Sequence, residues 1–109
     1  MKKNPLVSII MNCHNGELFL EQSLKSVFLQ SYKNWELIFW DNKSKDQSKK
    51  ILIKFKDKRV KYYYSKKFNS LYNSRNLAIK KAKGKYITFL DTDDFWHKEK
   101  LNNQLNFLI

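Results

Sequence analysis

The sequence is poor in the residues that most often cross-link or interrupt a chain. Its 109 residues include one cysteine, Cys13, one proline and two glycines. A single cysteine permits no internal disulfide and no thiolate-based zinc site within one chain. The scarcity of glycine and proline, beside 42% hydrophobic and 16% aromatic residues, excludes disordered, collagen-like and loop-dominated classes. We therefore expect one globular domain over residues 1–109, with Cys13 as a small buried residue.

Long apolar runs are also missing. No segment approaches the roughly eighteen uninterrupted apolar residues of a membrane span. The N-terminal stretch lacks the apolar region and small-residue cleavage site of a signal peptide. The expected location is the cytoplasm, with the inner face of the membrane as a peripheral alternative.

Arginine is scarce despite a net charge of +12, because only Arg59 and Arg75 among the 22 basic residues are arginines. A charge of this size raises the alternative of a non-catalytic basic module that binds nucleic acid or an anionic membrane face. Residues 58–85 hold ten cations and no acid, which favours an anionic ligand or surface. Specific phosphate and base recognition, however, usually relies on the bidentate guanidinium. We interpret the lysines mainly as a solvated face: no specific nucleic acid is expected, and peripheral membrane association stays open.

Hydrophobic patterning predicts alternating strands and helices. Apolar, β-branched or aromatic runs predict strands at residues 7–13, 36–41, 59–65 and 85–91. Helical spacing of apolar residues predicts helices at residues 17–30, 47–56, 71–83 and 97–108. Short connections through helices imply right-handed crossovers between parallel strands. The predicted fold class is therefore α/β: a Rossmann-like parallel sheet with helices on both faces.

Candidate caps mark several of these helix ends. Asn15 is the expected N-cap of the first helix, and Ser44 or Asp46 that of the second. Gly84 follows the third helix, where we expect it as a left-handed C-cap.

Polar residues follow the predicted strands, where parallel sheets bind their ligands. Because the carboxyl ends of parallel strands meet at one edge of the sheet, these residues should converge there. They are Asn12, His14, Asp41, Asn42, Ser65, Asp91, Asp93 and Asp94.

The acidic cluster Asp91-Thr92-Asp93-Asp94 is the strongest chemical signal. The turn after the first strand has a single glycine, and neither a dinucleotide-binding nor a P-loop glycine pattern occurs. In an extended segment Asp91 and Asp93 share a face, so two oxygen ligands could meet one Mg²⁺ or Mn²⁺ ion. The alternative, in which Asp93 and Asp94 cap the helix near His97, accounts for Asp94 alone but not for three adjacent like charges.

Five segments, in order along nearly the whole chain, resemble the family 2 glycosyltransferases, which have the GT-A fold. They are residues 7–15 (VSIIMNCHN), 26–32 (SVFLQSY), 35–41 (WELIFWD), 74–78 (SRNLA) and 84–94 (GKYITFLDTDD). The resemblance implies a GT-A sheet that is truncated here after its fourth strand and following helix. It implies binding of a nucleotide-diphosphate sugar, a UDP-sugar first, with GDP- or dTDP-sugars as alternatives.

The resemblance also assigns roles to residues. It places Asp41 near the base and ribose, Arg75 near the nucleotide, and Asp91 and Asp93 at the Mn²⁺ or Mg²⁺ ion. Asn12, His14, Asn42 and Thr92 complete the expected nucleotide-sugar site. His14 stands where the family commonly has tyrosine, and Asn42 where it often has a second acid. His14 could stack on a base, with metal ligation as the less favoured alternative, and the base is left open.

By resemblance, the expected activity is inverting transfer of a sugar to a glycan or lipid-linked acceptor in cell-surface polysaccharide synthesis. The general base lies in the acceptor-binding half of such enzymes, so no residue here is assigned that role. Besides the basic nucleic-acid module, a sugar nucleotidyltransferase of similar fold is a further alternative. It would be expected to carry a Gly- and Arg-rich loop after the first strand, which this sequence lacks.

Overall fold

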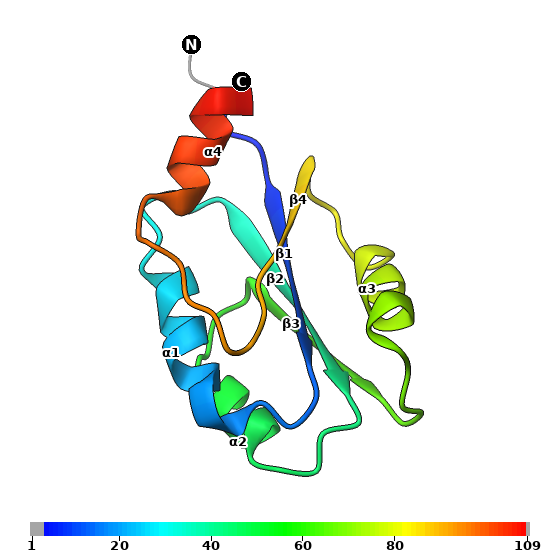
Figure 1. The fold of residues 1–109 in the computed structure, drawn as a ribbon. Coiled ribbons are helices and arrows are strands. Elements are labelled where there is room, and N and C mark those ends of the chain that lie inside the picture. The colour runs from blue at the N-terminus through cyan, green and yellow to red at the C-terminus, as the bar shows by residue number, and fades with distance from the viewer. Residues whose placement is uncertain (1–3, 109) are drawn as a thin grey trace.

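A computed structural model describes residues 4–108. Residues 1–3 and Ile109 lie outside the described residues, and residues 1–3 are the start of the N-terminal stretch in which no signal peptide was predicted. The chain forms a four-stranded parallel sheet in the order β3-β2-β1-β4, with helices on both faces (Figure 1). This confirms the predicted fold class. The elements are β1 (Val7–Cys13), α1 (Glu17–Phe28), β2 (Trp35–Asn42), α2 (Ser48–Ile53), β3 (Val60–Ser65), α3 (Leu71–Ile79), β4 (Tyr86–Phe89) and α4 (Lys100–Leu108).

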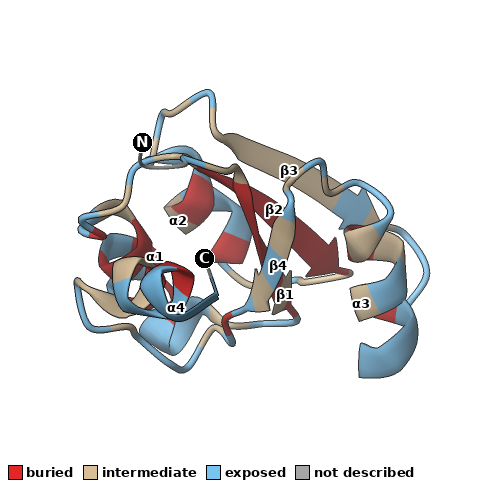
Figure 2. Cartoon of the chain, turned by 90° about the horizontal axis from the view of Figure 1, so that it is seen from above, coloured by how far each residue is buried: buried red, intermediate tan, exposed pale blue. Residues whose placement is uncertain are grey.

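The central strands β1 and β2 are buried on both faces, whereas β3 and β4 are only partly covered (Figure 2). Alternate residues of β1 and β2 pack under α1, α2 and α4 in the larger core. The intervening residues Ile10, Ile38 and Trp40 meet Ala78 of α3 in a smaller core on the opposite face. The period-2 alternation of a strand thus divides one apolar run between two cores. Cys13 lies in the larger core, as expected.

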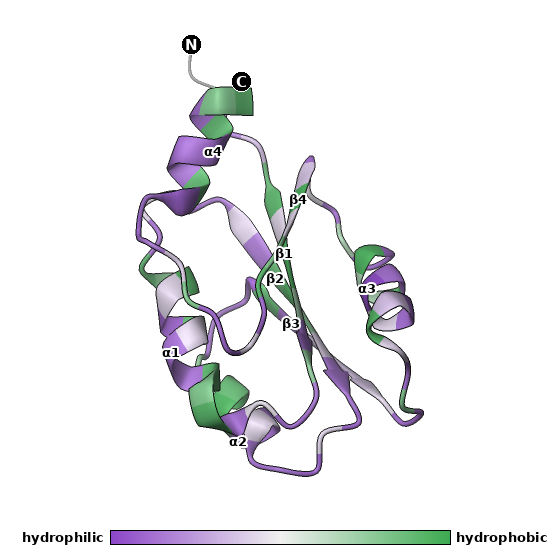
Figure 3. Ribbon diagram, viewed as in Figure 1, coloured by the Kyte–Doolittle hydropathy of each residue, from purple (hydrophilic) through white to green (hydrophobic). Residues whose placement is uncertain are grey.

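The register of β1 and β2 brings their carboxyl ends to the same level. Val7 pairs with Trp35 at one end of the ladder and Cys13 with Asp41 at the other. The loops that follow these two strands therefore begin side by side. The loop between β2 and α2 is hydrophilic (Figure 3), as expected for an exposed connection at a sheet edge.

A buried carboxylate ties the opposite, amino end of the sheet together. Glu36 accepts hydrogen bonds from the Ser8 hydroxyl and the Lys83 N–H, both at 2.6 Å, and Gly84 N–H donates to Ser8 Oγ at 2.8 Å. Burial alone would raise the pKa of Glu36, but these hydrogen bonds and nearby Lys61 hold that pKa below its ordinary value. The corner joins β1, β2 and the start of β4.

Several predicted boundaries and caps are wrong. The N-cap of α1 is Gly16, because Asn15 adopts a left-handed conformation with φ of 53° and its side chain instead accepts the Lys45 N–H. Helix α3 ends at Ile79, and neither glycine of the chain has positive φ, so Gly84 is not a left-handed cap. Gly84 is instead required by close approach of backbone, since an added Cβ would lie 2.6 Å from Ser8 N.

Three further elements, α2, β4 and α4, are shorter than predicted. Helix α2 begins at Ser48 behind Gln47, and Asp46 rather than Ser44 serves its first turn by accepting the Ser48 N–H. Strand β4 ends at Phe89, so the acidic cluster lies beyond the strand. Helix α4 begins at Lys100, three residues later than predicted.

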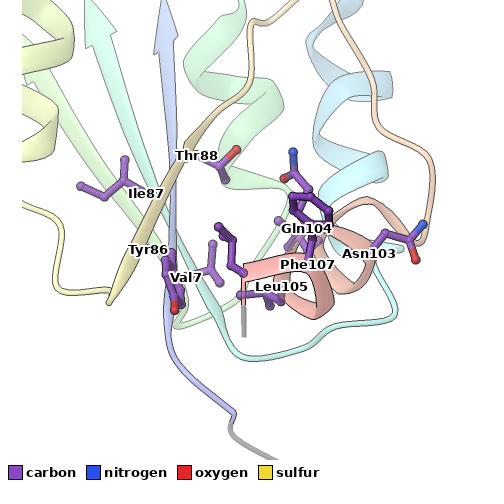
Figure 4. A pocket seen from close by; sticks show the side chains of 10 residues that line it. Val7, Tyr86, Ile87, Thr88, Asn103, Gln104, Leu105 and Phe107 are labelled. Carbon is purple, nitrogen blue, oxygen red and sulfur yellow. The ribbon is translucent and has the colours of Figure 1, made fainter.

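The free edge of β4 borders a groove. This groove of about 510 Å³ lies between β4 and α4 (Figure 4). Near it, Ile87 and Phe107 are exposed by 42% and 92%. None of the described helices combines the length and apolar character required to span a membrane.

The Gly84 contact makes a stability prediction. The Gly84→Ala substitution would bring a Cβ to 2.5–2.9 Å from Ser8 Oγ, Ser8 N and Leu6 O. Two of these, Ser8 N and Leu6 O, are backbone atoms of β1 and of the residue before it. They cannot move without disturbing the sheet. We expect the free energy of unfolding, measured by urea denaturation, to fall by about 1–3 kcal/mol.

Gly16→Ala is the matched control. Its Cβ would meet side-chain atoms only, the nearest being Thr92 Oγ1 at 2.8 Å. Thr92 lies in the turn beyond β4, which can shift more easily than the backbone of a central strand, so the loss should be smaller. A Gly84→Ala variant as stable as the unchanged protein would contradict the close-approach explanation.

Candidate functional site

A cleft of about 400 Å³ opens at the carboxyl edge of the sheet. Five of the predicted site residues line it: Asn12, His14, Asp91, Thr92 and Asp93. Apolar side chains of α1 and α3 complete its walls, among them Leu18 and Leu71. The convergence predicted from strand polarity therefore holds for the residues after β1 and β4.

The acidic cluster forms a turn and not the extended segment predicted from sequence. Asp94 N–H donates to the Asp91 carbonyl at 3.1 Å, and Ser23 of α1 donates its hydroxyl to the same carbonyl at 3.2 Å. The turn still gathers the carboxylates: one oxygen each of Asp91, Asp93 and Asp94 lies within 4.8 Å of the others. All three residues are exposed. The curvature of the turn thus brings the carboxylates together, as the alternation of an extended segment was expected to do.

This carboxylate group fits a divalent cation. Hard oxygen ligands suit Mg²⁺ and Mn²⁺, which often complete their coordination with phosphate oxygens and water. Neither Asp93 nor Asp94 caps α4, because that helix begins at Lys100 and its first turn is served by Gln30, whose Oε1 accepts the Leu101 N–H at 3.1 Å. The capping interpretation of Asp94 is therefore wrong. Three like charges in one turn repel one another, and a bound cation would relieve that repulsion.

Arg75 is the cation that the described residues bring to this turn. Its Nη2 lies 3.6 Å from Asp91 Oδ1, and its guanidinium lies over the Phe89 ring at 5.1 Å from the centroid. Both partners of the ion pair are substantially exposed, at 38% and 58% of their side chains. An exposed pair of this kind is weak, so it can be exchanged for a ligand at small cost.

His14 is held by a backbone contact that fixes its tautomer. His14 Nδ1 lies 2.7 Å from the Asn42 carbonyl oxygen. Because a carbonyl only accepts, Nδ1 carries a proton and donates it, and in the neutral ring Nε2 is then the acceptor. The ring also meets Phe68 edge-on at 4.7 Å. His14 is not part of the carboxylate group found in the described chain, so the structure gives no support to metal ligation by His14.

Asp41 and Asn42 use their side chains on the protein itself. Asp41 is 1% exposed; its Oδ2 accepts the Tyr62 hydroxyl at 2.6 Å and its Oδ1 accepts the Ser44 N–H at 2.9 Å. The Asn42 amide donates to the Asn69 carbonyl at 2.8 Å and accepts the Asn69 N–H at 2.9 Å. Neither residue lines the cleft.

Asn12, in contrast, keeps a free polar atom. Its Oδ1 is buried and has no hydrogen-bond partner among the residues that the structure describes. Such an orphaned acceptor is costly in a folded protein. Because Asn12 lines the cleft, a bound ligand could supply the missing donor.

Side chains of the loop after β2 accept hydrogen bonds from the backbone of the loop after β1. The sequence analysis did not predict these side chains as site residues. Ser44 Oγ accepts the Asn15 N–H at 2.8 Å, and Ser48 Oγ accepts the Gly16 N–H at 3.0 Å. Asp46 accepts the next N–H, that of Glu17, at 3.0 Å. The N–H groups that lead into α1, from Asn15 to Glu17, are thus satisfied from the neighbouring loop and not by a local cap. The S-x-D-x-S spacing of residues 44–48 is the signal that could have shown this.

A sequence model of the family described as "Glycosyl transferase family 2" matches residues 8–109. The chain is 47% identical over 107 residues to an uncharacterized glycosyltransferase of Haemophilus influenzae, covering 96% of this chain and 43% of that protein. It is 38% identical over 104 residues to the UDP-Glc:alpha-D-GlcNAc-diphosphoundecaprenol beta-1,3-glucosyltransferase WfgD of Escherichia coli, covering 95% and 41%. The chain therefore spans less than half the length of these relatives.

Solved structures share the fold. The crystal structure of S. aureus TarS 1-349 in complex with UDP-GlcNAc superposes with a TM-score of 0.87 at 28% identity, covering 94% of this chain and 30% of that one. The mannosyltransferase PcManGT of Pyrobaculum calidifontis, in complex with GDP-Man and Mn2+, superposes with a TM-score of 0.90 at 20% identity, covering 97% and 33%. The second likeness shows the fold alone.

The strained start of the second loop yields a prediction that needs no ligand. Lys43 has φ of 57°, a left-handed conformation that costs a residue with a Cβ about 1–2 kcal/mol. Glycine avoids this strain, although it loses more chain entropy on folding. We expect Lys43→Gly to raise the free energy of unfolding by a few tenths to about 1 kcal/mol in urea denaturation. Lys45→Gly, two residues on and without positive φ, should lower it; a loss of similar size for both would contradict this account.

Proposed function

The chain belongs to the glycosyl transferase family 2, and from that premise we propose that it binds a nucleotide-diphosphate sugar at the carboxyl-edge cleft, for transfer by the whole enzyme to a glycan or lipid-linked acceptor. The turn of Asp91, Asp93 and Asp94 beside that cleft carries the proposal. Carboxylates gathered at the ligand-binding edge of a parallel sheet are the arrangement that a metal-bound diphosphate requires.

Asp91 and Asp93 are the proposed ligands of Mn²⁺ or Mg²⁺. When bound, the cation supplies charge neutralisation for the departing nucleoside diphosphate. Asp91 also faces Arg75, which can turn from the carboxylate to a phosphate oxygen because the pair is exposed. Thr92 lines the cleft between the two acids and offers its hydroxyl to the same ligand.

The nucleoside is proposed to lie toward His14 and Asn12. The exposed His14 ring offers a planar face, and the unpartnered Asn12 Oδ1 offers an acceptor for a base or ribose donor. Asp41 and Asn42 are proposed to serve this subsite through the loops that they hold. UDP is the first candidate and GDP or dTDP the alternatives; the TarS and PcManGT complexes hold UDP-GlcNAc and GDP-Man respectively.

For the whole enzyme we propose inverting transfer in cell-surface polysaccharide synthesis at the cytoplasmic face of the membrane. WfgD is named for a diphosphoundecaprenol acceptor, and a Bacillus subtilis relative is named a putative teichuronic acid biosynthesis glycosyltransferase. A base must take the proton of the acceptor hydroxyl, and none of the residues that line this cleft is assigned that role.

Calorimetric titration with UDP and GDP, with and without Mn²⁺, tests the proposal. Asp93→Asn should preserve the fold and weaken Mn²⁺-dependent UDP binding by at least about tenfold, because it removes a charged oxygen ligand. Glu21→Gln is the matched control, since it removes one exposed negative charge on α1 and should leave affinity unchanged. Binding that ignores Mn²⁺ but falls steeply with salt would support the nucleic-acid module instead.

Arg75 gives a second, opposite-signed prediction. Arg75→Gln should raise the affinity for Mn²⁺ alone by up to about fivefold, because it removes a cation that competes for Asp91. The same variant should weaken UDP binding in the presence of Mn²⁺, because it has no guanidinium to contact the phosphate of the nucleotide. Lys80→Gln, at the other end of α3, controls for net charge. A parallel fall in both affinities would refute a competitive role for Arg75.

A further inference from the structure

Three connecting loops meet the sheet at its amino edge, and their charge is almost entirely positive (Figure 1). These loops, which lead into β2, β3 and β4, are residues 29–34, 54–59 and 80–85. Together they hold nine cations and one acid, Asp57. The loops at the carboxyl edge hold four charges of each sign; they are residues 14–16, 43–47, 66–70 and 90–94. The excess of positive charge is therefore segregated to the three loops of the amino edge, which we call the amino-edge surface.

The lysines of the amino-edge surface are free. Eight of its nine cations are lysines, and all eight are exposed. None of the eight lies within ion-pair distance of an acid in the described chain. The ninth cation, Arg59, pairs with Asp57 at 2.8 Å and lies over the Trp35 ring at 3.8 Å from the centroid. The carboxylate of Glu36 at this edge is buried and paired with Lys61 of β3. The exposed lysines therefore present charge that the described protein does not neutralise.

Contacts between the loops join them into one surface. Arg59 Nη1 donates to the Lys33 carbonyl at 2.9 Å, which ties the second loop to the first. Glu36 accepts the Lys83 N–H at 2.6 Å and lies 3.6 Å from Lys61 Nζ, which ties the third loop to β3. The lysines are thus held side by side by the fold and are not scattered along separate segments.

Helix ends account for only part of this charge. Cations stabilise the C-terminus of a helix, and Lys54 and Lys80 are the C-cap residues of α2 and α3. The other six lysines lie beyond those caps. A lysine-rich composition alone would give both edges a similar excess, which the carboxyl edge lacks. The connection from β4 to α4 returns to the amino edge at Lys98 and Glu99, and it adds one charge of each sign.

Exposed aliphatic side chains accompany the lysines. Leu29 is 69% exposed directly after α1, and Ile53 is 55% exposed at the end of α2. These two helix ends adjoin, because the rings of Phe28 and Phe55 stack at 5.2 Å. The aromatic residues of the three loops, Tyr32 and Phe55, are both half-buried. The amino-edge surface thus combines cations with exposed aliphatic groups and offers no fully exposed ring.

We propose that the amino-edge surface docks on an anionic lipid bilayer. Anionic headgroups attract exposed lysines, and aliphatic side chains gain free energy by entering the boundary of the acyl region. Nucleic acid fits this surface less well, because phosphate recognition favours arginine and unpaired bases stack on exposed rings. The single arginine here is engaged by Asp57.

The inference adds to the proposed function the surface that meets the membrane, and it rests on the amino-edge residues alone. The cleft lies at the opposite edge of the sheet, so docking leaves it open to the water in which a nucleotide sugar dissolves.

Co-sedimentation with lipid vesicles tests the proposal. The protein should bind phosphatidylcholine vesicles that contain about one-third phosphatidylglycerol, should bind pure phosphatidylcholine far more weakly, and should be released as salt rises. The triple variant Lys56→Gln/Lys58→Gln/Lys83→Gln removes three exposed lysines of the amino-edge surface. Its partition coefficient on the anionic vesicles should fall by at least about tenfold, because each lysine near an anionic surface contributes a several-fold factor.

Lys45→Gln/Lys66→Gln/Lys67→Gln is the matched control, because it removes three exposed lysines from the carboxyl edge and changes the net charge equally. It should bind the anionic vesicles nearly as tightly as the unchanged protein. Urea denaturation should show the same midpoint for both triple variants, since all six side chains are exposed. An equal loss of vesicle binding in the two variants would overturn the proposal, because net charge and not the amino-edge surface would then decide binding.

The Leu29→Asn/Ile53→Asn variant separates a bilayer from a nucleic acid. It should lower the partition coefficient on anionic vesicles by about fivefold or more, and it should leave binding of a single-stranded oligonucleotide unchanged. Equal binding to pure phosphatidylcholine, no vesicle binding, or tighter binding to the oligonucleotide than to vesicles at equal phosphate concentration would each refute bilayer docking. Loss of UDP binding with vesicle binding intact would refute the proposed function alone.

Discussion

The parallel register of β1 on β2 is the constraint on which the rest of this structure depends. It places Cys13 beside Asp41, so the two loops that follow leave the sheet at the same level. Only at that level can Ser44, Asp46 and Ser48 reach the backbone amides that start α1. A slip of one residue would turn the buried residues of one strand to the other face and separate these partners. The register is fixed by two cores at once, because both strands are buried on both faces.

The polar residues at the carboxyl edge divide into two groups with different work. One group forms its hydrogen bonds within the protein and thereby holds the loops: Asp41, Asn42 and Ser44. Asn12 and the acidic turn keep polar atoms that the described protein leaves unpaired or only weakly paired. A binding site needs both kinds, because free groups recognise a ligand only when other groups hold them in place. Burial therefore separates the polar side chains that are already paired within the protein from those whose polar atoms are available to a ligand.

Apolar runs, helical spacing and short connections were enough to predict the parallel sheet, the helices on both faces and the bounds of β1, because each of these is a pattern within the sequence. It could not predict Asn15 in a left-handed turn, since the groups that replace its cap belong to a loop about thirty residues away. The role of Gly84 was also misread, because a close approach to Ser8 leaves no periodic signal. The acidic cluster was located from sequence, but its turn was not, because the turn depends on Ser23 of α1. The burial of Asp41 depends likewise on Tyr62 of a third strand.

The strand order also bears on how the chain reaches this structure. The central strand β1 comes first in the chain, yet one of its neighbours is β4, so that Val7 pairs with Tyr86. Closing the long loop between β1 and β4 loses chain entropy before the contacts between the two strands form, which slows folding. Strands β1, β2 and β3 are separated by shorter loops and can associate earlier. Until β4 arrives, an apolar edge of β1 at Ile9 and Ile10 stays open, and this interval is when the folding chain is most exposed to pairing with another strand.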